Sequence, residues 1–139
     1  LAAAREPART PEARPRVFCP IWRDPWMAVG ADTYASDLLE RCGAANPFAG
    51  PAATGRGRRE RRYPVVTREQ VVAAAPDVVL LPDEPYAFGP ADAAELARLD
   101  LPAARAGRIH LIDGTWVSWY GPRIAEAVAG LRQLFAFPR

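Results

Sequence analysis

Seven aromatic side chains stand where predicted strands end or a predicted helix begins. They are Trp22, Trp26, Tyr63, Tyr86, Trp116, Trp119 and Tyr120. Ligands of open α/β sheets bind beyond the carboxyl ends of the strands, and aromatic rings there form a flat, apolar wall for a large planar ligand. We therefore expect at least three of these rings to line one cleft. The alternative is that Trp22 and Trp116 pack in the core.

Residue types that are typical of catalysis are scarce. The single histidine, His110, lies inside a predicted strand, where we expect a structural role. We expect Cys19 and Cys42 to be two buried thiols, although a disulfide between them stays open. One His and two Cys cannot form a common zinc site, and no Gly-rich phosphate loop, catalytic carboxylate pair or nucleophile elbow is present. We therefore expect a protein that is not an enzyme and has no cofactor.

Basic residues gather in one segment of an otherwise balanced chain. They are Arg56, Arg58, Arg59, Arg61 and Arg62. Such a cluster could bind an anion such as a catecholate or a phosphate, or it could be a solvated loop. The whole chain carries 18 basic against 16 acidic residues, a net charge of +2. That balance argues against a nucleic-acid partner.

The elements that must position these residues alternate between strands and helices. Apolar runs predict strands at 17–22, 78–81 and 108–113. Periodicity and capping residues predict helices at about 33–42, 67–75 and 90–98, and a last helix with Pro122 in its first turn. Residues 46–62 and 114–121 are expected to be loops. The order predicts an α/β fold, a single lobe with a small, mainly parallel sheet flanked by helices.

A length of 139 residues fits one domain. Residues 1–15 contain Pro7, Pro11 and Pro15, and we expect a linker there. No apolar run approaches the ~20 residues that span a membrane. No basic N-terminal segment leads into an apolar stretch, so we expect no signal peptide within this chain.

Five segments, taken in order, resemble one known family. They are WRDPWMAVGADTY (22–34), CGAANPF (42–48), YPVVTREQ (63–70), PDVVLLPDEP (76–85) and WYGPR (119–123). Together they resemble the C-terminal lobe of the periplasmic substrate-binding proteins that deliver vitamin B12 and iron-siderophores to ABC importers. The resemblance covers about residues 16–136.

The resemblance implies an architecture and a set of partners. Family members hold a small-molecule ligand between two α/β lobes that one long helix joins. Residues 16–139 then correspond to the C-terminal ligand-binding lobe, and residues 1–15 to a remnant of the interlobe connection. The missing N-terminal lobe and the ABC permease subunits would be the partners. The location would be the periplasm, or the cell surface through a lipid anchor.

The resemblance also assigns roles to particular residues. Tyr63 stands where B12-binding members place an aromatic residue against the corrinoid. Loops that face the ligand in the family correspond here to Trp26, Met27, Thr115, Trp116 and Trp119. Glu69 matches a glutamate that docks into an arginine pocket of the permease. The single histidine does not fit the members that bind bare zinc or manganese.

These observations predict a lobe that binds a chelated metal compound such as cobalamin by aromatic packing, without a reaction. One alternative is an iron-siderophore or haem-binding lobe, in which the arginine cluster reaches anionic groups. Another is a doubly wound enzyme or regulatory domain without a recognisable catalytic motif.

Overall fold

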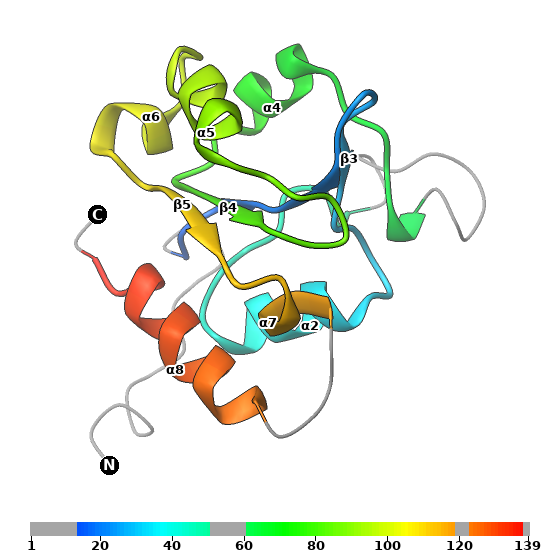
Figure 1. Ribbon diagram of the computed structural model, residues 1–139, viewed down its shortest axis with the longest axis vertical. Coiled ribbons are helices and arrows are strands. Elements are labelled where there is room, and N and C mark those ends of the chain that lie inside the picture. The colour runs from blue at the N-terminus through cyan, green and yellow to red at the C-terminus, as the bar shows by residue number, and fades with distance from the viewer. Residues whose placement is uncertain (1–13, 51–60, 119–122, 138–139) are drawn as a thin grey trace.

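The computed structural model describes residues 14–50, 61–118 and 123–137 (Figure 1). Its central feature is a three-stranded sheet in the order β1-β4-β5. These strands are β1 (Val17–Phe18), β4 (Val78–Pro82) and β5 (Ile109–Ile112). Both pairings are parallel, with Val17 opposite Val78 and Leu80 opposite His110. The predicted α/β fold with a mainly parallel sheet is confirmed.

Strand β4 shows how the apolar run builds two cores. All five of its residues are buried, and successive side chains of a strand point to opposite faces of the sheet. Val78 and Leu80 belong to one apolar cluster, and Val79 and Leu81 to the other. A central parallel strand is covered on both faces, which explains why its sequence is continuously apolar.

Helices cover both faces of the sheet (Figure 1). The helices that contribute to the first cluster are α2 (Tyr34–Arg41), α7 (Thr115–Ser118) and α8 (Ile124–Phe135). Those that contribute to the second are α4 (Arg68–Ala74), α5 (Pro90–Ala97) and α6 (Pro102–Ala106). No helix within the described residues is long and apolar enough to cross a membrane.

Side chains cap the starts of two predicted helices. The backbone amide of Gln70 donates to the Thr67 hydroxyl at 3.1 Å, and the backbone amide of Thr67 donates to Oε1 of the Gln70 side chain at 2.8 Å. This reciprocal pair is a capping box at the start of α4. Thr33 caps α2, because its hydroxyl accepts from the Ser36 amide at 3.0 Å.

The first predicted strand, 17–22, is two strands with different partners. Residues Val17–Phe18 form β1 in the parallel sheet, whereas β2 (Pro20–Trp22) pairs with β3 (Met27–Ala28) in an antiparallel hairpin. Proline has no amide hydrogen, so Pro20 cannot donate to a central ladder. The chain therefore leaves the sheet at Cys19, whose carbonyl accepts from the Val29 amide at 2.9 Å.

The loop predicted at 114–121 is wrong in its first part, where residues 115–118 form α7. The Asp113 carboxylate accepts from the Thr115 amide at 2.9 Å and starts this turn. The helix α6 was not predicted at all, and the last helix begins at Ile124 with Arg123 as its N-cap, not at Pro122.

Candidate functional site

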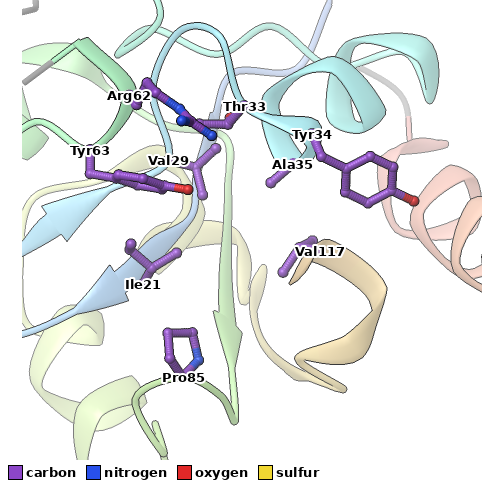
Figure 2. Close-up of a pocket in the computed structure, with 9 residues that line it drawn as sticks. All are labelled: Ile21, Val29, Thr33, Tyr34, Ala35, Arg62, Tyr63, Pro85 and Val117. Atoms are coloured by element: carbon purple, nitrogen blue, oxygen red, sulfur yellow. The ribbon is translucent and has the colours of Figure 1, made fainter. Parts of the chain in front are cut away.

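A pocket lies at the carboxyl edge of the parallel sheet (Figure 2). Its volume is about 300 Å³. The wall comes from the segments that follow β1, β4 and β5, from the start of α2 and from the segment before α4. The lining residues are Ile21, Val29, Thr33, Tyr34, Ala35, Arg62, Tyr63, Pro85 and Val117. This is the edge at which the sequence predicted a ligand site.

Backbone hydrogen bonds hold Arg62 and Tyr63 beside the hairpin. The Gly30 amide donates to the Arg62 carbonyl at 2.8 Å, and the Ala28 amide donates to the Pro64 carbonyl at 2.9 Å. A Cβ atom on Gly30 would lie 2.6 Å from Cδ of Pro64, so only glycine permits this approach. The pocket wall therefore depends on a residue that itself contributes no side chain.

The hydroxyl of Thr33 already has partners. It donates to the Gly30 carbonyl at 2.9 Å and accepts from the Ser36 amide at 3.0 Å. Thr33 therefore fixes the start of α2 at the pocket and has no hydrogen left to donate to a ligand.

Arg62 and Tyr63 supply a charge and a phenol to a largely apolar wall. The guanidinium carbon of Arg62 lies 5.6 Å from the centre of the Tyr63 ring. The Arg62 Nε atom is buried and has no hydrogen-bond partner within the described residues. Figure 2 shows the phenol oxygen of Tyr63 pointing toward Val29 and the interior of the pocket. This arrangement suits a ligand that carries negative charge.

Ion pairs do not neutralise this arginine within the part of the chain that the structure describes. The neighbouring Arg61 approaches Asp32 at 4.0 Å, whereas Arg62 takes part in none of the ion pairs found there. No group of three or more His, Cys, Asp or Glu side chains that could hold a metal ion occurs among the described residues.

The sequence matches no family model and no curated protein, but the fold matches solved structures. The periplasmic haem-binding protein BhuT, solved with two haems, is 30% identical, with a TM-score of 0.70 over 96% of this chain and 47% of that chain. The periplasmic haem-binding protein RhuT from Roseiflexus sp. RS-1 is 28% identical, with a TM-score of 0.72 over 96% of this chain and 50% of that chain. The vitamin B12 binding protein BtuF of Vibrio cholerae is 22% identical, with a TM-score of 0.66 over 88% of this chain and 44% of that chain.

This chain has the fold of one lobe of a class III periplasmic binding protein. It spans about half the length of the structures that it matches. Those proteins are binding proteins and not enzymes, in line with the expectation drawn from the missing catalytic motifs.

Trp26, which the resemblance placed in a loop that faces the ligand, lies in the core of the lobe. Its side chain is 8% exposed. The ring stacks on Phe88, with centroids 5.8 Å apart, and the Arg23 guanidinium lies 4.8 Å above it. Contacts with residues far along the chain therefore place Trp26 in the second core cluster.

The other predicted ligand residues lie in different places. Tyr63 lines the pocket. Met27 is half-buried in the hairpin, where it pairs with Trp22 and bridges to Val65, outside the pocket lining. Of the five predicted aromatic rings that the structure describes, only Tyr63 lines this pocket; Trp119 and Tyr120 lie outside the described residues.

Thr115 and Trp116 lie on α7 beside the pocket without lining it. The Thr115 hydroxyl donates to Asp113 at 2.7 Å, and the Trp116 indole donates to Glu126 at 3.1 Å. Val117, the next residue, lines the pocket instead. Sequence reasoning missed Val117 because it took this segment for a loop. Arg62 belongs to the arginine cluster for which the sequence left anion binding and a solvated loop open, and cluster members 56, 58 and 59 lie outside the described residues.

Glu69 stands in the first turn of α4 with an exposed side chain. It takes part in none of the ion pairs found within the described residues, whereas the neighbouring Arg68 pairs with Glu95 at 2.8 Å. The carboxylate is therefore accessible to a partner, and the docking role stays a prediction.

Proposed function

We propose that this chain is the C-terminal ligand-binding lobe of a periplasmic solute-binding protein that serves an ABC importer, and that its ligand is an anionic iron tetrapyrrole of the haem class. Residues 16–139 are the lobe in this proposal, and residues 1–15 belong to the connection with the second lobe. The ligand would lie between the two lobes and undergo no reaction.

The pairing of Arg62 with Tyr63 in the pocket carries the choice of ligand class. A guanidinium whose Nε is buried without a partner costs free energy that an anionic ligand offsets. Haem carries two carboxylates and an iron that a tyrosine can bind, so both side chains find a partner on it. Cobalamin carries mainly neutral amide side chains and a single phosphodiester, so it offers the guanidinium fewer anionic partners than haem does.

The comparisons support the same choice over the cobalamin that the sequence suggested. Two of the haem-binding proteins that the fold matches are 30% and 28% identical to this chain, and two others are 25% and 21% identical, against 22% for the vitamin B12 binding protein. The pocket volume of about 300 Å³ is at the lower end of the ~300–1,000 Å³ of ligand sites. That is expected of a lobe that forms only one side of a complete site.

Titration of haemin into this chain, followed by its Soret absorbance, tests the proposal. We expect micromolar affinity, a Soret maximum that shifts in Tyr63→Phe, and about tenfold weaker binding in Arg62→Gln. Arg41→Gln is the matched control, because Arg41 pairs with Asp37 on the exposed face of α2.

Three results would contradict the proposal. Haemin binding that neither pocket variant changes would place the ligand elsewhere. Tighter binding of cyanocobalamin than of haemin would return the choice to a corrinoid. A ferric siderophore that outcompetes haemin would keep the importer role and replace the ligand class.

A further inference from the structure

The short helix α7 has the pocket on one side and α8 on the other. Val117 faces the pocket and is 5% exposed. The ring of Trp116 points the other way and lies against Gly130 of α8: a Cβ atom on Gly130 would be 2.6 Å from Cζ3 of the indole. Gly130 therefore leaves a hollow in the surface of α8, and the indole of Trp116 fills it.

Polar contacts hold the indole in that hollow. Its Nε1 atom donates to Glu126 at 3.1 Å, and Glu126 also pairs with Arg123. Arg123 reaches back to Asp113 at 2.7 Å and donates to the Thr115 hydroxyl at 3.2 Å. The start of α7 and the start of α8 are thus joined by a network that includes Trp116 itself.

The two carboxylates of this network, Asp113 and Glu126, are ionised at neutral pH. The bonds from Trp116 and Arg123 lower the pKa of Glu126. The bonds from Thr115 and the nearby Arg123 lower the pKa of Asp113. Both carboxylates therefore stay ionised when the pH changes within the physiological range, so the orientation of Trp116 does not depend on such changes.

We propose that Trp116 and Gly130 are positioning residues that set the width of the pocket. The indole, seated on Gly130, fixes how far α7 stands from α8, and this distance fixes how far Val117 reaches into the pocket. This inference rests on the proposed function only for the identity of the ligand. The link between Gly130 and Val117 itself depends only on the packing of α7.

The substitution Gly130→Ala follows directly from this geometry. The added methyl group overlaps the far end of the indole, which the hydrogen bond from Nε1 to Glu126 holds in place. Because α7 contacts α8 on one side and α2 on the other, we expect α7 to move toward α2. We expect Val117 to enter the pocket and the affinity for haemin to fall at least about tenfold.

A second substitution separates a positioning role from a merely structural one. Val117→Ala shortens the side chain that enters the pocket, so the double variant Gly130→Ala/Val117→Ala should recover haemin binding to within about threefold of Val117→Ala alone. Because Val117→Ala also removes buried methyl groups, the double variant should have a lower melting temperature than Gly130→Ala. A structural role predicts the reverse, with the double variant binding more weakly than Gly130→Ala. Gln133→Ala, on the exposed face of α8, controls for helix propensity.

A readout without ligand separates failure of this inference from failure of the proposed function. Methyl NMR of the ligand-free chain should show Val117 closer to the ring of Tyr63 in Gly130→Ala than in the unchanged protein. Unchanged Val117 signals would overturn the inference, whatever the ligand. If the unchanged protein binds no haemin while Val117 moves as expected, the ligand class is wrong and the control of pocket width stands.

Discussion

Arg23 and Asp92 form an ion pair of 2.6 Å between elements that are far apart in the sequence. Arg23 lies in the hairpin between β2 and β3, and Asp92 lies in the first turn of α5. Both side chains are largely buried, at 15% and 13% exposure. The same guanidinium reaches Glu95 at 3.1 Å and covers the ring of Trp26. The pair therefore attaches the hairpin, which brings Ile21 to the pocket, to the rest of the lobe.

We predict that Arg23→Gln lowers the free energy of unfolding by about 2–4 kcal/mol, because it leaves the two carboxylates facing each other with little solvent. Urea unfolding followed by circular dichroism measures the change. The control is Arg41→Gln, which breaks an exposed pair with Asp37 and should cost less than about 0.5 kcal/mol. Equal losses in the two variants would show that the Arg23 network does not stabilise the hairpin.

The two cysteines should be inert in the folded protein. Both are free and buried, and burial raises the pKa of Cys19 to about 12 and raises the pKa of Cys42 as well. Since the thiolate is the reactive form, a chromogenic disulfide reagent at pH 8 should detect no fast thiol in the native chain and two thiols in urea. One rapidly reacting thiol in the native chain would be inconsistent with this packing.

His110 should make the lobe less stable in mild acid. Burial and the nearby Arg108 lower its pKa from the ordinary value of 6.5, so the unfolded chain binds the proton more readily than the folded chain. The contribution of neutral His110 to the free energy of unfolding is therefore fully present above pH 6.5, and it is lost as the pH falls below 6.5. Unfolding measured between pH 7.5 and pH 5 should show this loss, and His110→Gln should reduce it. An unchanged slope in that variant would assign the loss to other groups.

Local interactions explain what could be predicted from the sequence. The capping box of Thr67 and Gln70 joins residues three apart, and the buried run at 78–82 is continuous, so both are visible without a structure. The burial of Trp26 depends on Phe88, and the placement of Arg62 depends on the Gly30 amide. Val117 lines the pocket, and its neighbour Trp116 packs on Gly130 of the distant helix α8. Such long-range contacts have no signature in the local residue pattern.

Glu69 should serve a partner and not the fold. It is exposed in the first turn of α4, where the helix dipole contributes only about 0.3–1 kcal/mol. We predict that Glu69→Ala changes the free energy of unfolding by less than about 1 kcal/mol, yet lowers transport when placed in a full-length binding protein with its permease. Glu40→Ala, on the exposed end of α2, is the matched control. Normal uptake by the Glu69 variant would reject the docking role.

The central claim is that this lobe holds an anionic metal tetrapyrrole at the carboxyl edge of its sheet. The most direct measurement is a methyl and backbone NMR titration with gallium protoporphyrin, a diamagnetic stand-in for haemin. The account predicts that the largest chemical-shift changes occur at Ile21, Val29, Tyr63 and Val117, and that the signals of α5 and α6 change little. Shifts that gather on α5 and α6 and leave Tyr63 and Val117 unchanged would contradict it.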